Sequence, residues 1–379
     1  MSEMIQYAAT CLFGLEKFVG EEIDALGYKR TDTIDGRVFF EGDEGAIART
    51  NLWLRCAERV FIVLGNFPAP TFDALFEGTK ALPWERWIGC DDAFPVKGHS
   101  VRSALSSIPD CQSIVKKAVA TRLGAEYGKE WLEESGAKCQ IEFFILNDKA
   151  TLMIDTTGDP LHKRGYRPQA GGAPLRETLA AAMVKTSRPR EDVLLLDPFC
   201  GSGTIPIEAA LLMTNRAPGR HRRFAAESFI DLSEKLWSDA REEADSLVND
   251  STAFEAYGSD IDPEMVELSR LTAERAGVSG RVKFFRHDAR TIETNGRKGT
   301  IVCNPPYGER LGTVEEAVRL YGEIGKTFSS LDRWQIYVIT SDEDFEKHFG
   351  RKADKVRRLY NGMIRCGLYQ FFKNPKARD

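Results

Sequence analysis

The sequence has little of what marks membrane, secreted or metal-binding proteins. No run of apolar residues reaches 18, about the length that a membrane-spanning helix needs. The first residues lack the basic and then apolar stretch of a secretory signal. The eight cysteines form no CxxC pair, and the five histidines form no spaced cluster. We therefore expect a cytoplasmic protein with free thiols, no membrane partner and no metal site.

A large excess of positive charge is also missing. The 379 residues include 52 Lys and Arg against 57 Asp and Glu, a formal net charge of −5. Residues 1–155 hold 17 basic and 24 acidic residues, whereas the remainder is weakly basic. Any surface that binds a polyanion must therefore be local.

Length and pattern predict more than one domain. We place a first boundary at the proline-containing segment near residue 65, so that 1–65 and 66–155 form two small α+β units. Helices are expected over 15–26 and 110–128, and a hairpin turning at Asn147-Asp148. From about residue 192, short apolar strands alternate with helices. This pattern is typical of a mostly parallel, doubly wound α/β sheet.

A glycine-rich loop follows the apolar strand expected at 193–196. Glycine lets the backbone turn tightly and approach a ligand, and the helix expected from about Thr204 offers free N–H groups. No lysine follows the loop, and Pro206 occupies the third glycine position of the dinucleotide fingerprint, so neither a P-loop nor a complete dinucleotide site is indicated. The alternative is an ordinary strand–helix turn. Candidate cofactor-binding residues here are Asp197, Pro198, Phe199, Cys200, Gly201, Gly203 and Thr204.

Acidic residues follow two further strands. Asp260, with Ile261 beside it, is placed to accept the ribose hydroxyls of a nucleoside cofactor, whereas Asp262 suits a helix cap. Asp260 lies about 60 residues past the glycine loop, where the dinucleotide fold has about 20, so we expect an inserted helical segment at 215–252. Asp288 is a candidate acceptor for an adenine amine; as alternatives, Asp260 only caps a helix and Asp288 lies in a surface turn.

The tetrapeptide Asn304-Pro305-Pro306-Tyr307 follows the strand expected at 300–303. Proline lacks an N–H and holds the preceding residue extended, so this loop is stiff and presents carbonyl acceptors. The Asn304 side-chain oxygen and the Pro305 carbonyl could accept both hydrogens of a planar exocyclic amine, and Tyr307 could stack on its ring. We take Asn304, Pro305, Pro306 and Tyr307 as candidate catalytic residues; the alternative is a proline-rich turn.

In this order, DPFCGSGT, GSDID and NPPYGERLG resemble the motifs of class I S-adenosylmethionine-dependent amino-methyltransferases. The stretches YAATCLFGLEKFVGEEIDALGY, DTTGDPLHKRGYRPQAGGAPLRETLAAAMV and RRLYNGMIRCGLYQFF narrow the resemblance to THUMP-domain RNA methylases, specifically bacterial 23S rRNA guanine-N2 methyltransferases. The resemblance covers essentially the whole chain. It implies a ferredoxin-like segment at 1–65, a THUMP RNA-binding domain at 66–155 and a Rossmann-like methyltransferase domain at 156–379.

The same resemblance implies roles for the site residues. The glycine loop would hold the methionine part of S-adenosylmethionine, Asp260 its ribose, and Asp288 and Ala289 would border its adenine. The segment 172–178 is expected to touch the cofactor as well, and Asn304 to Tyr307 would form the target-base pocket. RNA phosphates would have to meet local basic residues, among them Lys116, Lys117, Lys163, Arg164 and Arg167.

The sequence therefore predicts methyl transfer from S-adenosylmethionine to the N2 amine of a guanine in RNA, with 23S rRNA as the first choice. Guanine-N2 methylation of tRNA, an amino-methyltransferase acting on DNA and a noncatalytic RNA-binding protein are the alternatives. A dinucleotide-dependent oxidoreductase would leave the Asn304–Tyr307 motif unexplained.

Overall fold

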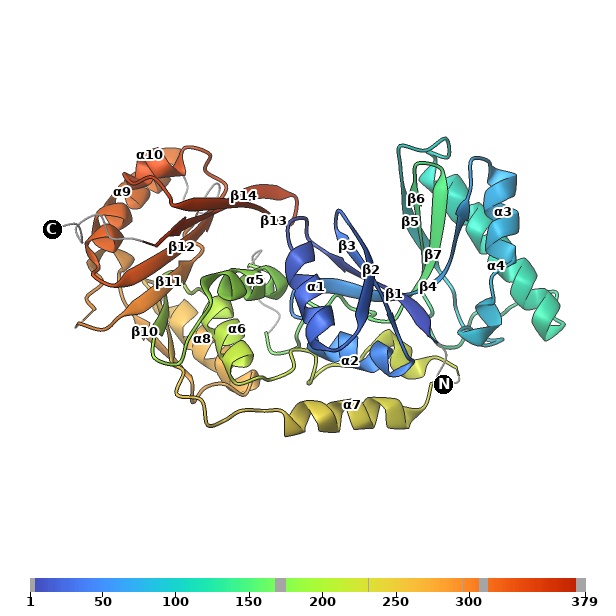
Figure 1. Ribbon diagram of the computed structural model, residues 1–379, viewed down its shortest axis with the longest axis horizontal. Coiled ribbons are helices and arrows are strands. Elements are labelled where there is room, and N and C mark those ends of the chain that lie inside the picture. The colour runs from blue at the N-terminus through green and yellow to red at the C-terminus, as the bar shows by residue number, and fades with distance from the viewer. Residues whose placement is uncertain (1–3, 168–174, 231, 295, 307–312, 373–379) are drawn as a thin grey trace. The chain divides into compact units, whose positions relative to one another are not determined.

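The computed structural model describes residues 4–167, 175–230, 232–294, 296–306 and 313–372 (Figure 1). Contacts divide the chain into two compact units, each assembled from segments that are distant in sequence. The first comprises Met1–Cys11, Val19–Leu161 and Arg222–Glu243, and the second comprises Leu12–Phe18, His162–His221 and Ala244–Asp379. The segment Arg222–Glu243 thus belongs to the first unit, although it follows the glycine loop in sequence. The domain boundaries expected near residues 65 and 155 remain a prediction.

In the described part of the chain, the first unit contains a seven-stranded sheet of order β2-β3-β1-β4-β7-β6-β5. All neighbouring strands pair antiparallel except β5 and β6, which are parallel. The long strand β4 pairs with β1 on one side and with β7 on the other, so the sheet continues past residue 65. The strands are β1 (Ile5–Cys11), β2 (Lys29–Ile34), β3 (Arg37–Gly42), β4 (Ala57–Pro68), β5 (Val96–Val101), β6 (Ile141–Leu146) and β7 (Lys149–Asp155).

The local expectations for this part of the chain are confirmed. Helix α1 ends just before Gly27, whose φ of +85° suits only glycine well. The β6–β7 hairpin turns at Asn147 and Asp148, which have φ values of 51° and 61° and are residue types that tolerate this conformation. The expected insertion does contain a helix, α7. The helices are α1 (Glu16–Ala25), α2 (Gly45–Trp53), α3 (Phe72–Lys80), α4 (Ile108–Tyr127) and α7 (Glu234–Ser246), with short 3-10 turns η1 (Trp84–Arg86) and η2 (Ala225–Ser228).

The second unit contains the predicted α/β sheet, of order β10-β9-β8-β11-β12-β14-β13. The five strands β10, β9, β8, β11 and β12 are parallel to one another, whereas β14 pairs antiparallel with β12 and β13 pairs antiparallel with β14. The chain runs outward from β8 to β10 and then returns to β11, so the topological switch lies between β8 and β11. The strands are β8 (Leu194–Asp197), β9 (Ala256–Asp260), β10 (Val282–Arg286), β11 (Gly299–Cys303), β12 (Trp334–Thr340), β13 (Lys355–Asn361) and β14 (Ile364–Phe371).

Helix α9 is fixed to this sheet by an apolar cluster. Ile324 and Phe328 of α9 pack with Ile301 of β11 and Ile336 of β12, all of them almost fully buried.

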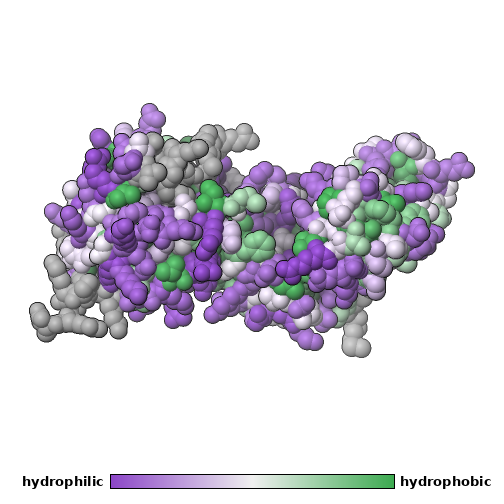
Figure 2. All heavy atoms as spheres, turned by 90° about the horizontal axis from the view of Figure 1, so that it is seen from above, coloured by the Kyte–Doolittle hydropathy of each residue, from purple (hydrophilic) through white to green (hydrophobic). Residues whose placement is uncertain are grey.

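The face drawn in Figure 2 is mostly hydrophilic, with its hydrophobic residues in small groups. The helices of this unit are α5 (Glu177–Ser187), α6 (Thr204–Met213), α8 (Pro263–Arg275), α9 (Val314–Ser330) and α10 (Phe345–Phe349), and η3 (Ala289–Thr291) is a 3-10 turn.

Helices α9 and α10 approach so closely that one position requires glycine. A Cβ at Gly325 would overlap the carbonyl oxygen of Phe349. At Gly322, one turn earlier, a Cβ would lie 3.5 Å from the carbonyl oxygen of His348, an ordinary contact. The two glycines therefore form a matched pair for testing this packing.

We predict that Gly325→Ala lowers the free energy of unfolding by about 1–3 kcal/mol, because the backbone of α10 must move. Gly322→Ala should not destabilise, because alanine is the better helix former by about 1 kcal/mol. Thermal unfolding of the two variants beside the wild type measures both effects. Equal melting temperatures for the two variants would contradict the close approach.

Candidate active site

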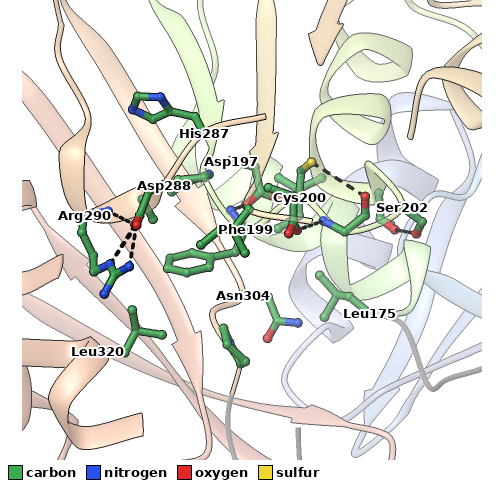
Figure 3. Close-up of a pocket in the computed structure, with 18 residues that line it drawn as sticks. Leu175, Asp197, Phe199, Cys200, Ser202, His287, Asp288, Arg290, Asn304 and Leu320 are labelled. Atoms are coloured by element: carbon green, nitrogen blue, oxygen red, sulfur yellow. Dashed lines mark hydrogen bonds and ion pairs between the residues drawn. The ribbon is translucent and has the colours of Figure 1, made fainter. Parts of the chain in front are cut away.

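Strands β8, β9, β10 and β11 end at one edge of the second sheet, and a cavity of about 430 Å³ lies there (Figure 3). Open α/β sheets bind ligands at this edge, beside the topological switch. Most of the predicted site residues line the cavity. They are Asp197, Pro198, Phe199, Cys200, Gly201, Thr204, Asp260, Ile261, Asp288, Ala289, Asn304 and Pro306, together with Leu175 from the expected segment 172–178.

The residues that line the cavity differ from the predicted set in two ways. Gly203 and the buried Pro305 are not among those that line the cavity, and Tyr307 lies outside the described residues. Further lining residues were not predicted. Ser202 lies inside the predicted loop and Arg290 two positions past Asp288, so motif spacing could have found both. Leu320 comes from α9, and no local signal points to it. The full set not predicted is Ser202, Ile205, His287, Arg290 and Leu320.

Gly203 is needed for the turn rather than for the cavity wall. It caps α6 with φ +82°, and its N–H donates to the Cys200 carbonyl at 2.7 Å. A Cβ here would lie 2.8 Å from the Phe284 ring and 3.0 Å from Cβ of Ser269. Any larger residue would strain the backbone and push the loop away from β10. As expected, α6 begins at Thr204.

The Asp260 carboxylate fixes the loop to the end of β9. Gly201 N–H donates to its Oδ2 at 2.9 Å, and Asp262 N–H donates to its Oδ1 at 3.1 Å. Each carboxylate oxygen can accept a further hydrogen bond, so a half-buried Asp260 can also receive hydroxyl donors from the cavity. Asp262 caps α8 through Glu264 N–H at 2.9 Å, which confirms that expectation.

Asp197 is a buried acidic residue that lines the cavity. Burial raises the pKa of its carboxyl well above the usual value; a hydrogen bond from Phe199 N–H opposes this, and the charge of Asp260 adds to it. A positive charge in the cavity would stabilise the ionised form of Asp197. A positively charged ligand group beside Asp197, together with hydroxyl donors to Asp260, would suit these two carboxyl groups.

Asp288 is more fully engaged than expected. Its oxygens accept hydrogen bonds from the Arg290 backbone N–H at 2.9 Å and from the Arg290 guanidinium at 2.6 Å (Figure 3). The hydrogen bond from Arg290 holds the pKa of Asp288 below its usual value. An adenine amine would have to share or displace these donors, so the role of Asp288 stays a prediction.

Asn304 lines the cavity, and its side-chain oxygen has no donor among the described residues. Its Oδ1 is buried and has no hydrogen-bond partner within the described residues. A buried carbonyl without a donor costs about 1–3 kcal/mol, so this atom is suited to a donor that arrives with a ligand. The neighbouring Pro306 carbonyl, by contrast, accepts a hydrogen bond from the Tyr321 hydroxyl at 3.2 Å.

The expectation that Arg164 contacts RNA phosphate is wrong. Its side chain is only 1% exposed and pairs with the buried Glu208 at 3.4 Å, and the Tyr166 hydroxyl donates to Glu208 at 2.9 Å. Arg167 is also turned inward: it donates to Thr204 Oγ1 at 2.7 Å and pairs with Glu177 at 3.2 Å. Arg167 therefore braces the start of α6.

The two lysines of α4 differ in their surroundings. Lys116 Nζ lies 2.5 Å from the Glu134 carboxylate and 3.6 Å from the centre of the Phe94 ring. Lys117 Nζ lies 5.9 Å from the centre of the Phe76 ring. Lys117 is therefore better placed than Lys116 to meet a phosphate, and the role of Lys163 stays a prediction.

Among the residues placed in the structure, no group of three or more His, Cys, Asp or Glu could hold a metal ion. Over the same residues, no helix is long and apolar enough to cross a membrane.

We predict that Arg164→Met lowers the free energy of unfolding by about 3–5 kcal/mol, because Glu208 keeps its buried charge and loses its partner. Lys283→Met, which breaks the exposed pair with Glu255, should leave the melting temperature nearly unchanged. Thermal unfolding decides. Weakened RNA binding by a normally stable Arg164→Met variant would restore the original prediction.

Family models match nearly the whole chain. Residues 164–370 match the RMKL-like methyltransferase domain, residues 6–61 the RlmL ferredoxin-like domain and residues 69–155 the THUMP domain. The chain therefore belongs to the family of RMKL-like methyltransferases, with a ferredoxin-like and a THUMP domain before the methyltransferase domain.

Two curated relatives illustrate this family. YpsC of Bacillus subtilis (strain 168), whose name assigns it provisionally to the RNA methyltransferases, is 46% identical over 98% of this chain and 96% of its own length. "Ribosomal RNA large subunit methyltransferase K/L" of Methylococcus capsulatus is 34% identical over 98% of this chain. The chain spans only 51% of the K/L protein.

Solved structures share the whole fold. A protein of Listeria monocytogenes described as a predicted N6-adenine-specific DNA methylase is 46% identical, with a TM-score of 0.92 over 97% of this chain and 96% of that one. SMU.472, described as a methyltransferase and solved with SAH, is 42% identical, with a TM-score of 0.91 over 98% and 99% of the two chains.

Proposed function

We propose that this protein transfers a methyl group from S-adenosylmethionine to the exocyclic N2 amine of a guanine in RNA, and that its substrate is 23S rRNA. One observation carries the proposal: Asn304, which lines the cavity together with the glycine loop and Asp260, has a buried Oδ1 with no partner among the residues described. The THUMP domain and the name of the K/L relative support RNA as the substrate class.

The residues of the cavity fit this cofactor. Asp260 has acceptor capacity left for the ribose hydroxyls, and Gly201 and Gly203 shape the loop that takes the methionine part. The carboxyl of Asp197 on the cavity wall would, when ionised, stabilise the positive sulfonium. Ala289, Asp288 and Ile261 line the side assigned to the adenine. S-adenosylmethionine supplies an electrophilic methyl group.

Asn304 would act on the acceptor amine. The lone pair of the guanine amine is delocalised into the ring, which makes the nitrogen a poor nucleophile. Asn304 Oδ1 would accept a hydrogen of the amine and favour a tetrahedral nitrogen as that nitrogen takes up the methyl group; the predicted second acceptor, the carbonyl of the buried Pro305, would have to become accessible to join it. Catalysis is then mainly alignment and electrostatic preorganisation. The proton leaves after the nitrogen has become cationic, so no strong base is needed beforehand.

The target guanine must be accessible to this cavity. A base inside a duplex cannot reach an enclosed pocket, so the substrate is an unpaired or flipped-out nucleotide. The same chemistry suits the N2 amine of a tRNA guanine and the N6 amine of adenine in DNA, the activity named for the Listeria relative. Only the RNA alternatives give the THUMP domain a role.

We predict that Asn304→Ala slows methyl transfer roughly 10²–10³-fold, the usual effect of removing one preorganised hydrogen-bonding group. Transfer from labelled cofactor to undermodified ribosomal RNA measures this. Asn304→Asp keeps acceptor oxygens and should retain part of the activity. Calorimetry should show cofactor affinity close to wild type for both variants. Full methylation by Asn304→Ala would overturn the proposal.

We also predict that Lys117→Glu weakens RNA binding and flattens its salt dependence, because one phosphate contact is lost. Lys116→Glu tests the second predicted contact and should have the smaller effect, since Lys116 is already paired with Glu134. Affinity for an rRNA fragment, measured across salt concentrations, gives both slopes. Unchanged slopes for both variants would exclude this face of α4.

A further inference from the structure

A line of hydrogen bonds links the end of β12 to the Asn304–Pro306 loop. The Tyr321 hydroxyl of α9 lies 3.2 Å from the Pro306 carbonyl oxygen and 3.0 Å from Thr340 Oγ1. The Asp342 backbone N–H donates to the same Thr340 oxygen at 3.1 Å. Tyr321 and Thr340 are essentially inaccessible to solvent, so water does not compete for these bonds.

Donor counting fixes the direction of this line. The Pro306 carbonyl can only accept, so the single hydroxyl hydrogen of Tyr321 is donated to it. Thr340 must then donate its own hydrogen to the Tyr321 oxygen, and its oxygen remains free to accept from Asp342 N–H. Within these three bonds, each hydroxyl donates once and accepts once.

The loop needs such an anchor because of its sequence. Pro305 and Pro306 have no N–H, so across these two residues the backbone can be held only through its carbonyl oxygens. Asn304 is two residues from the anchored Pro306 carbonyl, and proline permits little rotation between them. Fixing that carbonyl therefore limits how far Asn304 Oδ1 can move from its place on the cavity.

We propose that Tyr321 and Thr340 are positioning residues for methyl transfer: their hydroxyl pair fixes the Pro306 carbonyl and thereby holds Asn304 Oδ1 toward the acceptor amine. Neither residue is among those that line the cofactor cavity. The Tyr321 ring also packs against Phe345 at 5.1 Å between centres, and phenylalanine at this position keeps that contact. The kinetic part of this inference rests on the proposed function.

The test compares Tyr321→Phe and Thr340→Val with the wild type. We expect kcat to fall between roughly tenfold and a hundredfold for Tyr321→Phe, as for other small misplacements of a catalytic group. Cofactor affinity should stay within about twofold of wild type, because the cavity wall is untouched. Thr340→Val should also slow the reaction, and Thr340→Ser, which keeps the hydroxyl, should restore the rate.

The kcat of a double variant distinguishes a positioning role of the two hydroxyls from a general loss of packing. Thr340 acts on the loop only through the Tyr321 hydroxyl. The double variant Tyr321→Phe/Thr340→Val should therefore be no slower than Tyr321→Phe alone. Tyr337→Phe is the matched control: it removes another tyrosyl hydrogen bond, to Gln335 Oε1 at 3.2 Å, from the same strand as Thr340. Its kcat should equal that of the wild type.

The hydrogen-exchange rate of the peptide 299–306 measures the mobility of the loop without any substrate. Tyr321→Phe should speed exchange there and not in distant peptides. If this occurs while the wild type methylates no RNA, the proposed function fails, but the anchoring of the Asn304–Pro306 loop by Tyr321 stands. Unchanged exchange together with a kcat equal to that of Tyr337→Phe would overturn the positioning role. So would a loss of cofactor affinity that parallels the loss of rate.

Discussion

The hydrogen bonds that the Asp260 carboxylate accepts from Gly201 and Asp262 hold together the glycine loop and the end of β9, which both line the cavity. One oxygen ties the glycine loop, at the end of β8, to the end of β9, and the other orients the residue that caps α8. Cys200 N–H adds a parallel tie to the Ser259 carbonyl at 3.0 Å. These bonds give the loop one position relative to the sheet.

In that position the loop and β9 lie so close to β10 that two positions require glycine. Cβ atoms at Gly203 and Gly258 would both press on the Phe284 ring, so β10 can pack this closely only against glycine. Two polar groups of the cavity are also buried unfavourably. Asp197 is buried where its charged form is disfavoured, and Asn304 Oδ1 is buried with no partner in the described part of the chain. Such groups reduce the stability of the empty site, and a bound ligand that is cationic and rich in N–H donors relieves both.

Much of this site could be predicted from sequence because its residues follow apolar strands directly. The carboxyl ends of parallel strands meet at one edge, so motifs after β8, β9, β10 and β11 had to converge there. The inward turn of Arg164 could not be predicted in this way, since its partner Glu208 is 44 positions away and only the packed fold brings them together. Local charge alone made Arg164 look like a phosphate ligand. For the same reason the sequence did not show that Arg222–Glu243 packs with the first unit, or that Leu320 lines the cavity.

The central claim concerns which amine meets Asn304. The most direct measurement is nucleoside mass spectrometry of undermodified 23S rRNA, tRNA and DNA after incubation with the wild-type protein and isotopically labelled S-adenosylmethionine. The account predicts labelled N2-methylguanosine in 23S rRNA. Label in N6-methyladenine of DNA, or in no nucleoside at all, would contradict it.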